Sequence, residues 1–175
     1  MKMFTHLKDF NWIWVCGPQR SGTRIGSKII AHDTGHEWVQ ERDFNTDGLS
    51  SIYNLRIQKK LGERCVIQCP GLTRWIHRVC DPGDAVVMMF RPIKDIIASQ
   101  NRIDWQFDKI EAMKYDQESG SARLKYHFWT NGQKLAVEKA ASSFEVYYNS
   151  LSSHRLFVQK EHRAGWEHDR TEVEK

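Results

Sequence analysis

The stretch of sequence that decides the fold is Trp12-Ile-Trp-Val-Cys-Gly-Pro-Gln-Arg-Ser-Gly-Thr-Arg24, which runs from β-favouring residues into a helical pattern. In that pattern, Ile25, Ile29 and Ile30 share one helical face. A buried strand that passes through a Gly-containing turn into a helix directs several backbone N–H groups at one point. The helix dipole adds about half a positive charge there. The stretch therefore predicts an anion-binding loop.

Four further short apolar or β-rich runs predict strands, at 38–41, 65–69, 85–90 and 144–148. The run at 85–90 has no polar residue, which indicates a strand covered on both faces. Helical patterns lie between the runs, at 49–61, 93–97 and 121–141. Strands that alternate with helices imply right-handed crossovers and parallel pairing. We expect a three-layer α/β fold of the P-loop type, with a mostly parallel central sheet of about five strands.

Length and composition favour a single domain over 1–175, with an insertion at 103–120 and a charged tail at 154–175. The formal net charge is only +4 and no five basic residues are consecutive, so we expect no nucleic-acid partner. No apolar stretch approaches the ~20 residues that cross a membrane, so we expect no membrane partner. Polar residues interrupt the N-terminal segment, so no signal peptide is expected, and the four Cys are predicted to be thiols in the cytoplasm. The oligomeric state is open.

The loop differs from a Walker loop at two positions. Gly17 and Gly22 have the Walker spacing, but Thr23 and Arg24 stand where a nucleotide triphosphatase has Lys and then Ser or Thr. The point charge on the outer phosphates and one magnesium ligand are therefore missing. Arg20 instead offers a planar guanidinium suited to a bidentate oxyanion contact. A plain glycine turn is the structural alternative.

This loop resembles the 5′-phosphosulfate-binding loop of sulfotransferases that use 3′-phosphoadenosine 5′-phosphosulfate (PAPS). A second stretch, Val87-Met-Met-Phe-Arg-Pro-Ile-Lys-Asp-Ile-Ile-Ala-Ser99, resembles the 3′-phosphate motif of the same family. Some of the similarity is to tyrosylprotein and carbohydrate sulfotransferases. The donor-binding residues that the resemblance implies are Gly17, Pro18, Gln19, Arg20, Ser21, Gly22, Thr23, Arg24, Arg91 and Ser99.

The resemblance also implies a catalytic base and a reaction. Glu41 has the spacing of the family's base, with Glu37, Asp43 and His36 as alternatives. The implied activity is in-line transfer of a sulfuryl group from PAPS to an acceptor hydroxyl or amine, leaving adenosine 3′,5′-bisphosphate. Arg20 would stabilise charge on the bridging oxygen, and the backbone amides of 21–23 would hold the 5′-phosphate. No metal is expected, and the acceptor is a small molecule, a glycan or a peptide.

Two departures from the family keep alternatives open. Gln68 occupies the position of a family Lys, which removes a cation beside the sulfuryl group. The stretch Tyr148-Asn-Ser-Leu151 resembles the Tyr-Glu-Asp-Leu that ends the family's core, but without its acidic residues. The alternatives are a small P-loop kinase-like phosphotransferase and a catalytically degenerate nucleotide-binding relative.

The remaining constellations predict packing and no site. Cys65 and Cys69 in one strand would be ~13 Å apart, too far to share a zinc ion with His77 and Cys80. Trp12 and Trp14 alternate along the first strand, so we expect both in the core on one side of the sheet.

Overall fold

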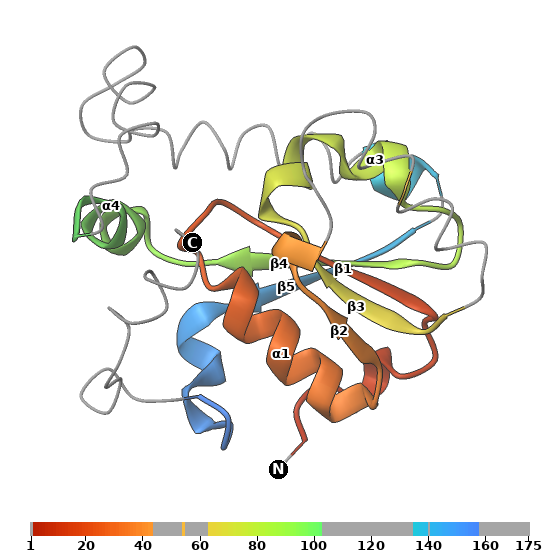
Figure 1. Ribbon diagram of the computed structural model, residues 1–175, viewed down its shortest axis with the longest axis horizontal. Coiled ribbons are helices and arrows are strands. Elements are labelled where there is room, and N and C mark those ends of the chain that lie inside the picture. The colour runs from red at the N-terminus through yellow and green to blue at the C-terminus, as the bar shows by residue number, and fades with distance from the viewer. Residues whose placement is uncertain (1, 44–53, 55–62, 103–134, 140, 158–175) are drawn as a thin grey trace.

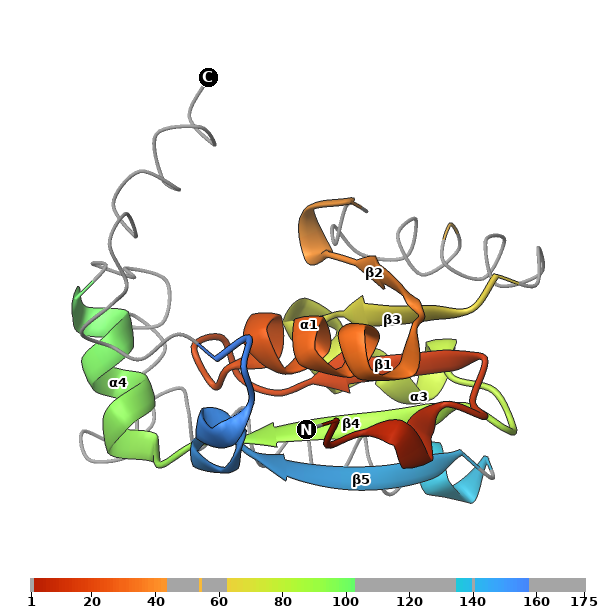
Figure 2. The ribbon, with the colours of Figure 1, turned by 90° about the horizontal axis from the view of Figure 1, so that it is seen from below.

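The computed structural model describes residues 2–43, 54, 63–102, 135–139 and 141–157. These residues form a five-stranded sheet of order β2-β3-β1-β4-β5, and all four pairings are parallel. In Figure 2 the strands lie side by side with their arrowheads pointing toward α4. The strands are β1 (Trp12–Cys16), β2 (Glu37–Val39), β3 (Cys65–Gln68), β4 (Ala85–Phe90) and β5 (Ser142–Tyr147). The predicted α/β class with a parallel sheet of about five strands is confirmed.

Helices lie on both faces of this sheet and at its carboxyl-terminal edge. Helix α1 covers one face, α3 lies on the other, and α4 lies beyond the strand ends (Figures 1 and 2). The α-helices are α1 (Thr23–Thr34), α3 (Ile76–Val79) and α4 (Ile93–Arg102). Four short 3-10 helices complete the described elements, η1 (Thr5–Leu7), η2 (Glu41–Asp43), η3 (Pro70–Trp75) and η4 (Tyr148–Ser153).

Side chains of the central strands alternate between two buried clusters, as the period of a strand requires. Trp12 and Trp14 lie in the cluster on the α3 side and are 3% and 0% exposed, which confirms the prediction for both. Ile13 and Val15 belong to the cluster on the α1 side, together with Ile29 and other residues of α1. Strand β4 is buried on both faces over residues 85–89, as its unbroken apolar sequence predicts.

The boundaries of three strands differ from the prediction. Strand β2 ends at Val39 and not at residue 41, because Gln40 and Asp43 close a turn: the Asp43 N–H donates to the Gln40 carbonyl at 2.9 Å and the Gln40 N–H to the Asp43 carboxylate at 2.7 Å. Glu41 therefore begins η2. Strand β3 ends at Gln68, and β5 begins at Ser142. The predicted helix at 49–61, the insertion at 103–120 and most of the pattern at 121–141 lie outside the described residues, as does the tail after 157.

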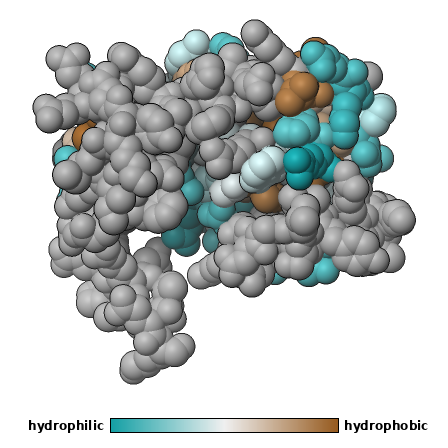
Figure 3. Space-filling view, turned by 90° about the horizontal axis from the view of Figure 1, so that it is seen from above, coloured by the Kyte–Doolittle hydropathy of each residue, from teal (hydrophilic) through white to brown (hydrophobic). Residues whose placement is uncertain are grey.

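The described surface is polar with scattered apolar side chains. Figure 3 shows mainly hydrophilic described residues on one face, with small separate hydrophobic areas. The exposed large hydrophobic side chains of the described part are Trp75, Val137 and Tyr147. Within the same part of the chain, no helix combines the length and the apolar character that crossing a membrane would require.

Candidate functional site

The loop between β1 and α1 has a backbone that requires glycine at two positions. Gly17 and Gly22 have φ of 141° and 101°. A Cβ at Gly17 would lie 2.9 Å from the Met89 carbonyl oxygen, and one at Gly22 would lie 2.4 Å from Tyr148 Cδ2. Arg20 has φ of 74° and is the one non-glycine residue with positive φ in the part of the chain that the structure describes. Such strain at a polar loop is typical of a functional site.

The loop leaves the N–H groups at the start of α1 available to an anion. Gly22 is the N-cap of α1 and supplies no side-chain cap, and the first hydrogen bond of the helix runs from Gly26 N to Gly22 O. The N–H groups of the first helical turn therefore have no acceptor within the helix. The Ser21 N–H, by contrast, donates to the Pro18 carbonyl at 3.0 Å, which closes the turn. The Ser21 hydroxyl is buried and has no hydrogen-bond partner in the structure.

Helix α4 lies against this loop and brings the two sequence motifs together. Arg20 Nε donates to Ser99 Oγ at 3.0 Å, across 79 residues of sequence. Arg91 Nη1 donates to the Arg20 carbonyl at 3.0 Å, across 71 residues. Arg102 Nη2 lies 3.4 Å from the same Ser99 hydroxyl, and Gln100 Nε2 lies 3.4 Å from the carbonyl of loop residue 19. Two guanidinium groups, those of Arg20 and Arg102, therefore contact the Ser99 hydroxyl, and a third, that of Arg91, contacts the Arg20 backbone.

Arg20 resolves a difficulty in pairing Arg91 with Ser99. Eight residues along a helix would separate the two side chains by ~12 Å. Arg91 precedes α4, and its guanidinium contacts the backbone of Arg20, while the Arg20 side chain reaches Ser99. The two predicted residues are thus joined through a third.

Tyr148, the first residue of η4, packs on both parts of this site. Its ring lies 4.5 Å from Arg91 Cζ in a cation–π contact, and the same ring fills the space that a side chain at Gly22 would take. Phe157 contacts the Tyr148 ring edge-on, with ring centroids 5.3 Å apart. Tyr148 belongs to the terminal motif 148–151, but the motif does not predict this contact, because no spacing rule relates residue 148 to residues 22 and 91.

The structure places Glu41 and Asp43 at the carboxyl-terminal edge, because both follow the end of β2. Glu41 Oε1 accepts a hydrogen bond from the Gly71 N–H at 2.7 Å. Glu37 begins β2 and is therefore at the opposite edge, as is His36, whose Nε2 lies 2.6 Å from the Phe10 carbonyl. Of the four candidate bases, only Glu41 and Asp43 share an edge with the loop.

A buried polar group supports the loop from below. The Thr73 hydroxyl accepts from the Gly17 N–H at 3.0 Å and lies 2.7 Å from the Pro70 carbonyl, so it ties η3 to the loop. Cys16 and Cys69 lie beside it, with their Sγ atoms 3.5 Å apart. Burial, followed by the neighbouring Cys16 and Glu41, raises the pKa of the Cys69 thiol well above its usual range. Thr73 belongs to no sequence motif, so its role at the loop is not predictable from the sequence.

Comparisons with known proteins add one structural likeness. No protein-family model matches the sequence, and no curated protein matches it. A solved structure of shikimate kinase from Acinetobacter baumannii in complex with shikimate is similar with a TM-score of 0.43 and 12% identity. The likeness covers 81% of this chain and 86% of that one. A likeness at this level assigns neither a ligand nor a reaction.

Taken together, the parallel sheet and the glycine-requiring loop between β1 and α1 define the chain as an α/β protein of the P-loop type. The loop places backbone N–H groups and the Arg20 guanidinium at one end of a helix. Arg91, just before α4, and Ser99, within α4, both form hydrogen bonds with Arg20. Such a cluster suits a ligand that carries phosphate or sulfate groups.

Proposed function

We propose that the chain is a sulfotransferase that uses PAPS as donor and transfers the sulfuryl group to an acceptor hydroxyl or amine. The observation that carries the proposal is the hydrogen bond from Arg20 to Ser99, with Arg91 held on the Arg20 backbone. It joins the two stretches that resemble the 5′-phosphosulfate and 3′-phosphate motifs of that family. A donor with phosphate at both positions would need both stretches close together.

The residues divide between the two ends of the donor. The N–H groups of Gly22 and Thr23 and the dipole of α1 would hold the 5′-phosphate, while the Ser21 N–H already donates within the loop. Arg91 and Ser99 would bind the 3′-phosphate with charge-assisted hydrogen bonds. Arg20 lies between them and would stabilise the charge that develops on the bridging oxygen as the S–O bond of the donor breaks.

Glu41 would accept the proton of the acceptor as the new S–O or S–N bond forms. Its Oε1 accepts from the Gly71 N–H, and this bond orients the carboxylate at the edge where the loop lies. Gln68 ends β3, half-buried at the same edge, and would offer the acceptor or the sulfuryl group an amide in place of the family's cation. Glu41→Gln would keep the shape and lower sulfuryl transfer by a factor of about 10²–10⁴. An unchanged rate would remove Glu41 from this role.

Binding of adenosine 3′,5′-bisphosphate, compared with Mg-ATP, tests the donor. We expect the bisphosphate to raise the unfolding temperature more than Mg-ATP does. Arg20→Ala and Arg91→Ala should each weaken the binding of the bisphosphate by about 1.5–3 kcal/mol. Arg78→Ala is the matched control, because that guanidinium lies over the Trp75 ring at 4.4 Å in α3 and not at the site. Equal shifts from both ligands, or full affinity in both site variants, would contradict the assignment.

The second candidate is a small P-loop phosphotransferase. The similar solved structure is that of a kinase, which agrees with this candidate, but its TM-score of 0.43 leaves the reaction unassigned. Against it, Thr23 and Arg24 replace the Walker Lys and hydroxyl, and Arg91 follows β4 where no Asp closes the strand. A larger thermal shift with Mg-ATP than with the bisphosphate would favour the kinase.

A third candidate, a degenerate relative that binds without turnover, is separated by activity. Labelled PAPS offered with a mixture of hydroxyl and amine acceptors would yield a labelled product only from an active enzyme. The same mixture would identify the acceptor as a small molecule, a glycan or a peptide. We also propose that the sulfotransferase acts in the cytoplasm.

A further inference from the structure

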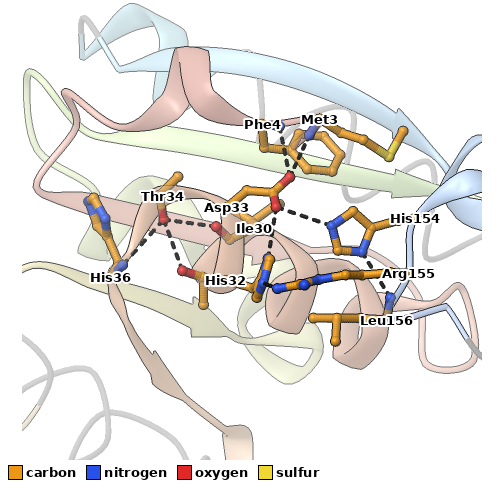
Figure 4. Close-up of polar contacts among 11 residues, drawn as sticks. Met3, Phe4, Ile30, His32, Asp33, Thr34, His36, His154, Arg155 and Leu156 are labelled. Carbon is orange, nitrogen blue, oxygen red and sulfur yellow. Dashed lines mark hydrogen bonds and ion pairs between the residues drawn. The ribbon is translucent and has the colours of Figure 1, made fainter. Parts of the chain in front are cut away.

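A cluster of three titratable residues, two of them buried, lies at the other end of α1 from the loop. Asp33 Oδ2 accepts from the N–H groups of Met3 at 2.5 Å and Phe4 at 3.1 Å. Its Oδ1 lies 2.9 Å from His32 Nδ1 and 3.1 Å from His154 Nε2. The side chains of Asp33 and His154 are 0% and 1% exposed. Figure 4 shows the three segments that meet at this carboxylate.

The partners of the two rings determine where their protons lie. The Leu156 N–H donates to His154 Nδ1 at 3.2 Å, so the proton of a neutral His154 is on Nε2, facing Asp33. Arg155 Nη2, always a donor, lies 2.5 Å from His32 Nε2, so the proton of a neutral His32 is on Nδ1 and also faces Asp33. Asp33 thus accepts four hydrogen bonds.

This arrangement distinguishes the cluster from a metal site of the same composition. The three ligand atoms lie within 4.8 Å of one another. A metal ion, however, needs the lone pairs of the ring nitrogens that here carry protons. The cluster is therefore a hydrogen-bonded junction. Burial raises the pKa of Asp33, and the hydrogen bonds from His32, Met3, Phe4 and His154 outweigh it, so the pKa is lower than the ordinary 3.8.

The segment that His154 anchors leads back to the candidate site. The His154 N–H donates to the Leu151 carbonyl at 2.9 Å, and Leu151 is fully buried in the cluster on the α1 side. The Phe157 N–H donates to the His154 carbonyl at 2.9 Å, which turns the chain so that the Phe157 ring meets Tyr148. Tyr148 in turn packs on Gly22 and Arg91. The His154 backbone is thus hydrogen-bonded to Leu151 and Phe157 within the segment 148–157, and the first residue of this segment, Tyr148, packs on the loop.

We propose that Asp33 and His154 are positioning residues for the nucleotide site, acting through Tyr148. Their hydrogen bond attaches residues 148–157 to α1, and this attachment holds the Tyr148 ring against Gly22. The ring in turn stacks on the Arg91 guanidinium and keeps it in the orientation that reaches the Arg20 carbonyl. The proposal rests on the proposed function only for the identity of the ligand. Thr23 to Asp33 is ten helical residues, about 15 Å, so neither positioning residue touches the ligand.

The test combines ligand affinity with hydrogen exchange in the full chain, well below the unfolding temperature of each variant. Asp33→Asn places an amide N–H₂ among N–H donors, and His154→Leu removes the donor. We expect each to weaken the binding of adenosine 3′,5′-bisphosphate by about three- to thirtyfold. We also expect each to speed, by a similar factor, amide exchange at Ser21 and Gly26, whose N–H groups donate to the Pro18 and Gly22 carbonyls. His154→Gln, whose amide nitrogen reaches the place of Nε2, should recover most of both losses, which a purely steric role of the ring would not predict.

Asp84→Asn is the matched control. Asp84 is 4% exposed, and its Oδ2 accepts from Trp14 Nε1 at 2.9 Å and from the Asp81 N–H at 2.8 Å, before the start of β4. It should lower stability without changing affinity or loop exchange. The positioning role would be overturned if Asp33→Asn and His154→Leu matched the wild-type protein in bisphosphate affinity and amide exchange. It would also be overturned if Asp84→Asn caused an equal loss. If the wild-type protein binds no bisphosphate, the proposed function fails, while amide exchange at Ser21 and Gly26 still decides the positioning role.

Discussion

The two ends of helix α1 are built on opposite principles. At its N-terminus, a loop with strained backbone at Arg20 holds guanidinium groups near N–H groups that have no acceptor in the helix. At its C-terminal end, the Asp33 carboxylate is buried and accepts hydrogen bonds from four donors. One end thus places positive charge beside N–H groups that have no acceptor within the helix, while the other uses its charge within the fold. A polar cluster is a candidate for binding when its hydrogen bonds are incomplete.

The largest expected effect comes from Gly22→Ala at the N-terminal end. The added methyl group would clash with the Tyr148 ring, and the loop backbone would hold alanine at a positive φ. We therefore expect a loss of roughly 2–5 kcal/mol in the free energy of unfolding. Bisphosphate binding should be lost as well. Chemical denaturation and calorimetric titration measure the two effects.

Gly35→Ala is the control for Gly22→Ala. Gly35 has φ of 76° at the C-terminal end of the same helix, but nothing lies within 4 Å of its added Cβ. It should cost only the strain of positive φ, about 1–2 kcal/mol, and leave binding intact. An equal loss in the two variants would mean that Tyr148 does not press on the loop.

Asp33→Asn should remove about 1.5–3 kcal/mol from the free energy of unfolding at pH 7, because buried donors lose a charged acceptor. The pKa of Asp33 is lowered on folding, so its contribution is complete above the unfolded value near 3.8 and is lost as the pH falls through the folded value. The difference between wild-type protein and variant should therefore narrow below pH 4. Urea denaturation between pH 7 and pH 3 measures it, and a constant difference would contradict the linkage.

The smallest expected effect is that of Arg91→Lys, which keeps the charge. Lysine loses the planar stack on Tyr148 and one of the fixed donors, so bisphosphate binding should weaken by about 1 kcal/mol. Arg78→Lys breaks a comparable stack on Trp75 outside the site and should leave the affinity unchanged. If the two variants bind equally well, stacking on Tyr148 does not orient Arg91.

Much of the fold follows from local sequence. The unbroken apolar run at 85–90 predicts a strand buried on both faces, and Trp12 and Trp14 predict their own side of the sheet, because a strand has a period of two. The predicted end of β2 was wrong by two residues, since a turn closed by the Asp43 carboxylate competes with the strand at Gln40. Side-chain to backbone competition of this kind is not visible in a hydrophobic pattern.

The sequence by itself determined the parallel α/β class, and it predicts an anion-binding loop after β1 and carries the two stretches that bear the family resemblance. Period, glycine spacing and residue chemistry are local properties, and neighbouring residues are enough to express them. Only the tertiary structure decided that Arg20 joins Arg91 to Ser99, that Tyr148 covers Gly22, and that Asp33 meets His154 across 121 residues. These contacts depend on which segments the sheet and its crossovers bring side by side. No residue spacing along the chain specifies which distant segments become neighbours.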